Sequence, residues 1–600
     1  MAASPLSRIV AGAAERVDRS IGWSKLPKLL ALPVLIGLRG RLRQKNLHDT
    51  GRGPLNRPPF TDPNQADHLG ARTLDGTYND LDDPLMGSIG SRFGRNVPLE
   101  HTWPDELPML LEPNPRVVSR ELLTRETFQP ATTLNLLAGA WIQFEVHDWF
   151  SHGDNDPATS WEIPLADDDP WPQNPMRVDR TLPDPSLEEG KPSTFVTADT
   201  HWWDGSQIYG STPEFADAIR SHELGKLKLG ADGLPPPELD ANIDFRGVAG
   251  NFWVGLALLH SLFMREHNAV CDRIHAKHPE LSDQELYEKA RLVVAALMAK
   301  IHTVDWTPAI IAHPTTVLGM RANWYGLLGE RFDRKFGRKT RNEVIRGIPG
   351  SPTNHHGIPY ELTEEFVAVY RMHPLIPDQF VFRSFADDSV LQERELPELG
   401  ALEVRNRLGE MSMTDLLYSF GRLHPGAITL HNYPRFLQDF HRPGGEHIDL
   451  AAIDVLRLRE RGVPRYNDFR RLFHLKPAAT FDELTDNPRW ARELERVYEG
   501  DVEKVDVMIG MYAEPKPKGF GFSDTAFRVF ILMASRRIES DRFFTTDYRP
   551  EVYTQAGFDW VEENTMRTLL LRHHPELAPA LEGVANPFAP WQAVGAKSGG

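Results

Sequence analysis

The sequence predicts a mainly α-helical protein that folds as one large domain with few short strands. Beyond Thr132, apolar side chains recur at helical spacing over residues 132–152, 252–277, 282–302, 362–373, 413–423 and 524–542. Strand patterns are sparse, no internal repeat occurs, and the composition does not change between about residues 130 and 590. Although 600 residues could form several domains, this uniform composition favours one.

The first 50 residues differ from the rest and are expected to form a separate amphipathic segment. Residues 26–38 read LPKLLALPVLIGL, and basic residues follow at Arg39, Arg41, Arg43 and Lys45. This run is shorter than the roughly 20 residues that span a bilayer. It either lies in the headgroup layer of a membrane, as a peripheral contact, or packs as a helix against the main body. Basic residues on both sides, with no evident cleavage site, argue against a secretory signal.

Charge and cysteine content exclude several classes of protein. The chain carries 84 acidic and 67 basic residues, a net charge of −17, and no basic block, so nucleic acid is not expected as a partner. The single cysteine, Cys271, allows neither an internal disulfide nor a cysteine-built metal site. Cysteine poverty agrees with a reducing compartment, and we expect an intracellular protein, peripherally bound to a membrane if residues 1–50 make that contact.

Two further segments are expected to lack regular structure. Residues 51–116 are rich in Pro, Gly, Asn and Asp and show no periodic pattern, which predicts an irregular segment wrapped over the body. Residues 591–600 are expected to form a flexible tail. By contrast, Ser282 and Glu285 form a capping box at the start of a helix.

The segment LLAGAWIQFEVHDWF, residues 136–150, carries the first candidate chemistry. Gln143 and His147 lie four residues apart on one mostly apolar helical face. A buried histidine with a glutamine one turn away can take and return a proton near neutral pH. Taken alone, the segment is better explained by a core histidine whose hydrogen bonds are satisfied.

The segment FVAVYRMHPLIPD, residues 366–378, carries the second. Tyr370 and His373 are neighbours at helical spacing three, and Pro374 stops the helix. An imidazole at a helix end can reach an iron from one side, and a tyrosine beside it can lose an electron. A packed aromatic and a helix-terminal histidine favoured by the helix dipole explain the pattern equally well.

Together these motifs make the sequence recognisable. QFEVHDWFSH and YRMHPLIPD, with LHSLFMREHN at residues 259–268, resemble the animal-type haem peroxidase and cyclooxygenase superfamily and, within it, the fatty-acid alpha-dioxygenase family of plants. The resemblance extends from about residue 26 to 560. It implies that residues 51–590 form a mainly helical haem peroxidase-like catalytic domain that binds one haem b per chain.

The resemblance also implies roles for individual residues. His147 would be the distal histidine with Gln143 as its partner, His373 the proximal iron ligand, and Tyr370 the residue that becomes a catalytic radical. Two other histidines of the third motif, at positions 260 and 267, are then structural. No match to the positions that link haem covalently is found in the sequence, so the haem is expected to be non-covalently bound.

Two later motifs point to a carboxylate. IHTVDWT contains His302 and Thr307, although alone it could be a helix end. On the late helix, Phe530, Met533, Ala534 and Arg537 form one stripe, and a buried Arg537 needs a partner, for which Asp541 one turn later is a candidate. In the family pattern His302 and Thr307 help to hold the substrate carboxylate, and the second arginine of SRRIESDRFFT binds it, so Arg537 is preferred to Arg536 and Arg542.

An arginine, a histidine and a threonine that converge on one anion would fix its position. The carbon next to the carboxylate would then face Tyr370, while the alkyl chain enters an apolar tunnel. A cyclooxygenase must instead present a carbon in the middle of the chain. The depth at which the carboxylate binds therefore decides which hydrogen is lost.

The segment THWWDGS, residues 200–206, places oxygen donors at alternate positions, as a loop around a hard cation does. Without the resemblance, a turn at Asp-Gly is the better explanation. The resemblance implies calcium bound by Asp148, Thr200, the Trp202 carbonyl, Asp204 and Ser206.

The function that we expect is haem-dependent alpha-dioxygenation of a long-chain fatty acid. Tyr370, oxidised after hydrogen peroxide activates the haem, would remove a hydrogen from C2, and O2 would add there to give a 2-hydroperoxy acid. The alternatives are a general haem peroxidase that oxidises small donors, and a non-catalytic haem-binding, membrane-associated protein. The sequence sets neither the preferred chain length, nor the oligomeric state, nor the partner of the second nitrogen of His373.

Overall fold

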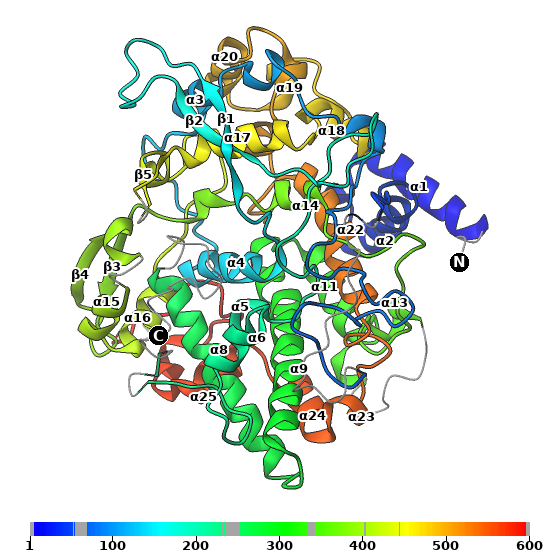
Figure 1. Cartoon of the computed structure of the whole chain (residues 1–600), viewed down its shortest axis with the longest axis vertical. Coiled ribbons are helices and arrows are strands. Elements are labelled where there is room, and N and C mark those ends of the chain that lie inside the picture. Colours follow the sequence, from blue (N-terminus) through cyan, green and yellow to red (C-terminus); the bar gives the residue numbers. More distant parts are fainter. Residues whose placement is uncertain are drawn as a thin grey trace.

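Two long helices, α8 (Val254–His275) and α9 (Asp283–Ile301), form a hairpin in the lower half of the body in this computed structural model (Figure 1). Helix α4 (Leu136–Trp149) packs against α8, and one large hydrophobic core joins these helices to the C-terminal third of the chain. The structure describes residues 5–51, 53, 69–230, 233–234, 253–332, 342–400, 404–442 and 445–595. The predicted fold class, mainly helical and built as one domain with few short strands, is confirmed.

Five of the six predicted helices lie where the sequence places them. They are α4, α8, α9, α16 (Met413–Arg422) and α22 (Asp524–Ser540), with ends that differ by a few residues. The capping box of α9 is present, because the Ser282 side chain accepts from the Glu285 amide and the Glu285 side chain from the Ser282 amide. Ser523 caps α22 by accepting from the Ala526 amide.

The sixth predicted helix is much shorter than expected. Helix α14 ends at Val369, and His373 begins a separate 3₁₀ turn, His373–Leu375. A helix continued past Tyr370 would need the amide of residue 374 to bond the Tyr370 carbonyl, and proline has no N–H. The Met372 amide bonds that carbonyl instead, at 2.8 Å. The prediction that Tyr370 and His373 share a helical face was therefore wrong.

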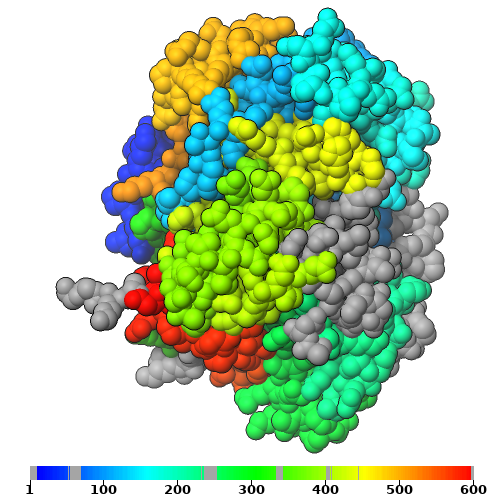
Figure 2. Space-filling model, turned by 90° about the vertical axis from the view of Figure 1, so that its left-hand side faces the viewer, coloured from blue at the N-terminus to red at the C-terminus, as the bar shows by residue number. Residues whose placement is uncertain are grey.

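In the part of the chain that the structure describes, the strands form three two-stranded antiparallel sheets at the edges of the body. They pair β1 (Asn155–Ile163) with β2 (Met176–Thr181), β3 (Gln379–Arg383) with β4 (Val390–Glu395), and β5 (Phe440–His441) with β6 (His447–Ile448). Figure 2 shows β3, β4, α15 and α16 in yellow-green, standing above the red C-terminal helices.

The remaining helices are mostly short and cover this core. They are α1 (Pro5–Ile21), α2 (Lys28–Lys45), α3 (Pro115–Val118), α5 (Ser206–Tyr209), α6 (Pro213–Ala218), α10 (Thr307–Ile310), α11 (Pro314–Tyr325), α13 (Glu343–Arg346), α14 (Glu364–Val369), α15 (Val404–Glu410), α17 (Leu450–Glu460), α18 (Tyr466–Leu472), α19 (Phe481–Leu484), α20 (Pro488–Val497), α21 (Val507–Ala513), α23 (Pro550–Tyr553), α24 (Gln555–Glu563), α25 (Met566–His573) and α26 (Ala578–Leu581).

The N-terminal segment packs on the body as a helix. Helix α2 contacts α1, α11 and α22 and buries Leu35, Leu38 and Leu42. The first turn of α2 is not buried, since Leu29 is 82% and Leu30 61% exposed. None of the helices that the structure describes is both long and apolar enough to cross a membrane.

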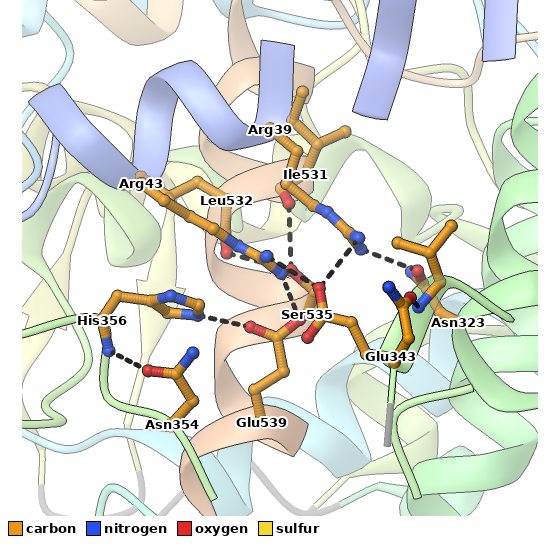
Figure 3. Close-up of polar contacts among 12 residues, drawn as sticks. Arg39, Arg43, Asn323, Glu343, Asn354, His356, Ile531, Leu532, Ser535 and Glu539 are labelled. Atoms are coloured by element: carbon orange, nitrogen blue, oxygen red, sulfur yellow. Dashed lines mark hydrogen bonds and ion pairs between the residues drawn. The ribbon is translucent and has the colours of Figure 1, made fainter. Parts of the chain in front are cut away.

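Ion pairs fix α2 to the body (Figure 3). Arg43 pairs with Glu343 at 2.9 Å and also with the buried Glu539 of α22. Arg39 donates to Asn323 at 2.8 Å, and His356 lies 2.6 Å from the second oxygen of Glu539. The arginines of the N-terminal basic run thus face carboxylates of the protein, and Arg41 pairs with Glu15.

Of the two segments expected to be irregular, residues 51–116 agree with the prediction better than residues 591–600. Of residues 51–116, those that the structure describes before Pro115 form only bends, turns, bridges and two short 3₁₀ turns, Leu99–His101 and Met109–Leu111. The expected C-terminal tail begins with a buried residue: Trp591 is 1% exposed and its indole donates to the Pro587 carbonyl. Residues 596–600 of that tail lie outside the described residues.

Candidate active site

A cavity of about 340 Å³ brings the predicted haem residues together. Gln143 and His147 reach it from α4, and Tyr370 and His373 from the turn that follows α14. Two imidazoles from separate elements therefore line one cavity, and Tyr370 lines it as well. Trp253, which the sequence analysis did not select, positions Gln143, because its indole donates to the Gln143 side-chain oxygen at 2.7 Å.

Asp454 of α17 is the partner of His373 that the sequence does not supply. An oxygen of its carboxylate lies 2.8 Å from Nδ1 of His373, which leaves Nε2 as the nitrogen able to bind a metal. Tyr433 donates to the same carboxylate at 2.9 Å, and Arg371 pairs with it. Although burial raises the pKa of Asp454, His373 and Arg371 outweigh burial and hold it below its usual range. The carboxylate therefore stays charged.

Tyr370 is buried among aromatic rings. Its ring centroid lies 4.5 Å from that of Phe366 and 5.2 Å from that of Trp149, edge to face in the second case. Burial raises the pKa of Tyr370 above its usual range, despite the nearby Arg537. The phenol therefore keeps its proton, as a side chain that gives up a whole hydrogen atom must.

Arg537 carries a buried guanidinium that is held by ring faces. Its Cζ lies 3.8 Å from the Trp149 ring centroid and 4.2 Å from that of Trp203. Among the described residues, its Nε and Nη2 have no hydrogen-bond partner. The expected structural partner Asp541 is engaged elsewhere, with Arg72 at 2.9 Å, so that alternative was wrong. A buried cation with free donors is suited to an incoming anion.

The neighbouring arginines are differently employed. Arg536 donates to the carbonyls of Ile358 and Pro359 at 2.9 and 2.7 Å, and Arg542 to the Leu69 carbonyl at 2.7 Å. Nη2 of Arg536 is thus bonded to backbone oxygens, although its Nε has no hydrogen-bond partner among the described residues, and Arg542 also pairs with Asp547. This difference supports the choice of Arg537 from the sequence motif.

His302 stands beside Arg537, against the same two tryptophan rings, each with its centroid 5.2 Å from that of the imidazole. The indole of Trp141, which can only donate, bonds Nδ1 of His302 at 3.2 Å. Burial, reinforced by Arg537, lowers the pKa of His302 well below its usual range. His302 is therefore neutral and carries its proton on Nε2, where it can serve as a donor.

Thr307 follows His302 across a π-helical turn, His302–Trp306, between α9 and α10. Such turns occur frequently at functional sites. The Thr307 hydroxyl is fully buried and has no hydrogen-bond partner among the described residues. The IHTVDWT motif is therefore not a simple helix end, because the helix continues through this wider turn into α10.

Glu145 is a buried acid that the motifs do not single out. One of its oxygens accepts from the Trp203 indole at 2.7 Å. Burial and the neighbouring Asp148 raise the pKa of Glu145 well above its usual range. This carboxyl therefore tends to be neutral and does not supply the missing counter-charge of Arg537.

The five residues expected around calcium also lie together, and none is more than 1% exposed. The Ser206 hydroxyl donates to Asp148 at 3.0 Å, and the Thr200 hydroxyl to Asp204 at the same distance. The Ser206 amide lies within 3.1 Å of both carboxylates. At Gly205 the backbone has φ of 80°, and a Cβ there would meet the Tyr209 ring at 2.9 Å.

Comparisons with known proteins agree with this geometry. The model of the family described as animal haem peroxidase matches residues 71–584. The chain is 38% identical to alpha-dioxygenase PIOX of Pisum sativum, covering 96% of this chain and 90% of that protein, and 38% identical to alpha-dioxygenase 1 of Arabidopsis thaliana, covering 96% and 91%. The chain belongs to the alpha-dioxygenase family.

Solved structures of the alpha-dioxygenase family show the same fold. The Oryza sativa fatty acid alpha-dioxygenase superposes with a TM-score of 0.90 at 36% identity, covering 99% of this chain and 98% of that one. A tyrosine-to-phenylalanine variant of that protein, solved with palmitic acid, gives the same values. Membership of the animal haem peroxidases implies that this alpha-dioxygenase binds haem.

Sequence reasoning missed several residues of this alpha-dioxygenase site, among them Glu145, Trp149, Trp203, Trp253 and Asp454. Trp149 and Glu145 lie inside the QFEVHDWFSH motif and Trp203 inside THWWDGS, but the sequence analysis assigned them no role. Asp454 has no local signal, because it reaches His373 only through the packing of α17. His267, expected to be structural, bonds the Tyr209 hydroxyl at 3.0 Å and the Gly225 carbonyl at 2.9 Å.

Proposed function

We propose that this chain is a fatty-acid alpha-dioxygenase in which Tyr370 removes a hydrogen from C2 and O2 adds to that carbon. The observation that carries the proposal is that Arg537 and Tyr370 contact the same tryptophan, Trp149. The Trp149 ring contacts both the guanidinium of Arg537, whose Nε and Nη2 have no hydrogen-bond partner among the described residues, and the phenol ring of Tyr370. A carboxylate on Arg537 would therefore place the adjacent carbon, and no distant one, near Tyr370.

His373 would hold the iron of one non-covalent haem b per chain, and His147 lines the same cavity. The fit rests on the Nδ1 of His373 being taken by Asp454, which fixes the ring and leaves Nε2 for the metal. When bound and activated by hydrogen peroxide, the haem supplies the one-electron oxidant that converts Tyr370 to a radical. His147, with Gln143 beside it, would take and return the protons of the peroxide.

In the reaction itself, the Tyr370 oxygen takes a hydrogen atom from C2, which leaves a carbon radical. O2 forms a bond to that carbon, and the resulting peroxyl radical takes the hydrogen atom back from Tyr370. The product is a 2-hydroperoxy fatty acid, and Tyr370 is again a radical. Because the raised pKa keeps the phenol protonated, this hydrogen is present when the peroxyl radical needs it.

Three donors would hold the substrate carboxylate. Arg537 offers its free Nε and Nη2, His302 its Nε2 proton, and Thr307 its buried hydroxyl. The carboxylate in turn would supply the counter-charge that the described protein lacks at Arg537, and a charge-assisted bidentate pair is the strongest arrangement open to both.

The alkyl chain would run along α22 towards the N-terminal segment. Ala534 and Phe530, one and two turns before Arg537, line an apolar groove with Leu32, Leu35 and Ile36 of α2. Contact of this region with a membrane surface, from which a fatty acid could enter, stays a prediction, supported by the exposure of Leu29 and Leu30.

Calcium would bind to Asp148, Thr200, the Trp202 carbonyl, Asp204 and Ser206. The donor set fits, because two carboxylates and two hydroxyls, all oxygen ligands, are buried around one short loop. Asp148 directly follows His147 on α4, so an ion here would fix the end of the helix that carries the distal histidine.

Oxygen uptake with palmitate tests the proposal. Tyr370→Phe should lose fatty-acid oxygenation by at least about a hundredfold, since no other group is placed to take the hydrogen atom, while its haem absorption spectrum stays that of the wild type. Tyr553→Phe is the matched control, because Tyr553 is also buried but donates to the Phe543 carbonyl, away from the cavity. Undiminished oxygenation by Tyr370→Phe would overturn the mechanism.

A further inference from the structure

The hairpin of β5 and β6 places three metal-ligating side chains on one face. Asp439 directly precedes β5 and His441 is the last residue of that strand, and their ligand atoms lie within 4.8 Å of each other. His447 is the direct cross-strand neighbour of His441 in the antiparallel register. Within the part of the chain that the structure describes, these three are the only group of at least three His, Cys, Asp or Glu ligand atoms all within 4.8 Å of one another.

Contacts within the hairpin hold the three side chains close. Nε2 of His447 lies 2.6 Å from Oδ1 of Asp439. The rings of His441 and His447 are stacked, with centroids 4.0 Å apart and planes 8° apart. On its other face, His447 stacks on Trp171 at 3.9 Å. The Trp171 ring thus fixes one ligand, while Asp439 and His441 remain exposed and free to adjust.

We propose that Asp439, His441 and His447 form a binding site for a divalent transition-metal ion of the zinc type. Two imidazole nitrogens and one carboxylate oxygen are a ligand set that Zn²⁺ takes in proteins, with a water molecule in the fourth position. The ion would take the place of the proton shared by His447 and Asp439. Metal–ligand bonds of about 2.0–2.2 Å require those two atoms to separate by somewhat less than 1 Å, which the exposed Asp439 side chain allows. Because an imidazole binds a metal in the plane of its ring, the exposed His441 ring must also turn out of its stack with His447.

Charges around the hairpin do not oppose a cation. The nearest arginine in sequence, Arg442, pairs with Glu446 at 2.7 Å. Arg116, whose Cζ lies 4.9 Å from the Trp171 ring centroid, pairs with Asp169 and Asp449. Both guanidinium charges are thus offset by carboxylates, and the carboxylate of Asp439 is left to the two histidines.

The proposed metal site is separate from the active-site cavity. Phe440 and Ile448 form the neighbouring cross-strand pair, and both line that cavity. Because side chains alternate along a strand, His441 and His447 point the opposite way, towards the surface. A bound ion would therefore join the two strands from outside without touching the haem residues.

Calorimetric titration of the haem-loaded, full-length protein with zinc chloride tests this proposal. The protein must carry no histidine tag, and calcium is kept in excess so that the acidic loop near Asp148 is not available to zinc. We expect one saturable zinc ion per chain. His441→Ala and His447→Ala should each weaken its binding by at least about tenfold, because each removes one of three ligands.

His222→Ala is the matched control. His222 is likewise an exposed histidine beside an aspartate, Asp217, at 3.2 Å, but it belongs to no such group of three in the described residues. Zinc binding should be unchanged in this variant. Oxygen uptake without zinc, equal to that of the wild type, shows that each variant is folded. Absence of a one-to-one site, or equal zinc affinity in all variants, would overturn the proposal.

Discussion

Asp454 lies 2.8 Å from Nδ1 of His373, at the back of the active-site cavity. Tyr433 and Arg371 bond the same carboxylate, so it is held in place from three sides. A charged carboxylate on the far nitrogen of a metal-binding imidazole raises the electron donation of that ring. With His373 as the proposed iron ligand, Asp454 would stabilise the oxidised form of the iron.

Asp454→Asn should therefore raise the reduction potential of the bound haem. The amide keeps the shape of the side chain but loses the negative charge, and we expect a rise of at least about 60 mV, a tenfold change in a one-electron equilibrium. Spectroelectrochemical titration measures it. Asp449→Asn is the control, because Asp449 caps the same helix and is buried and ion-paired, but with Arg116. Equal shifts in both variants would argue for a general structural effect.

Arg537→Met should weaken the use of fatty acids and spare that of phenols. Removing a buried partner of a charged group costs about 2–5 kcal/mol, so kcat/KM for palmitate should fall by at least about thirtyfold. Arg536→Met is the matched variant, since Arg536 is equally buried but bonds backbone carbonyls. If palmitate turnover survives in Arg537→Met while phenol oxidation is strong, the chain is a general peroxidase.

Removal of calcium should destabilise the protein. A ligand that is present at about a hundred times its Kd stabilises the folded state by about 2.7 kcal/mol, and that contribution would be lost on chelation with EGTA. The thermal midpoint of unfolding, measured with calcium and with EGTA, should therefore fall in the wild type. In Asp204→Asn the two midpoints should coincide. A wild-type midpoint that does not respond to EGTA would contradict the calcium assignment.

Stability should decrease as the pH falls below about 6.5, in part through His267. Burial lowers the pKa of His267 to about 4, although the Gly225 carbonyl opposes the shift. In the unfolded chain a histidine takes up a proton near pH 6.5. Between those values only the unfolded state is protonated at this site, so stability is fully present above pH 6.5 and is lost towards pH 4.

His267→Gln should flatten that dependence by about 1.4 kcal/mol per pH unit, the contribution of one proton. Denaturant unfolding followed by circular dichroism at several pH values measures the slope. Above pH 7.5 the slopes of wild type and variant should agree, even if their absolute stabilities differ. Equal slopes between pH 4 and 6.5 would show that His267 does not contribute.

The helices of the core could be predicted because their signals are local. Ser282 and Glu285 mark the start of α9, and apolar periodicity gives α8 and α22 to within two residues at each end. The error at α14 was also local in origin. Pro374 was taken to end the helix one residue before itself, whereas its missing N–H acts on the carbonyl four residues earlier, at Tyr370.

The candidate site was predictable only in part, for a physical reason. His147, Tyr370, His373 and Arg537 lie in motifs whose order along the chain is characteristic, so the sequence names them. The partners that hold them come from other elements through tertiary packing. Asp454, on α17, and Trp203, in the loop before α5, carry no spacing that relates them to His373 or Arg537.

The two contacts of Trp149, with Arg537 and with Tyr370, fix the position at which a bound fatty acid is oxidised. Its rigid indole contacts both the Arg537 guanidinium and the Tyr370 ring, so a single ring sets the distance from the substrate carboxylate to the phenol. Lengthening the substrate adds methylene groups only beyond that span. Fatty acids of different length should therefore all be oxidised at the same carbon, even where they are bound with different strength.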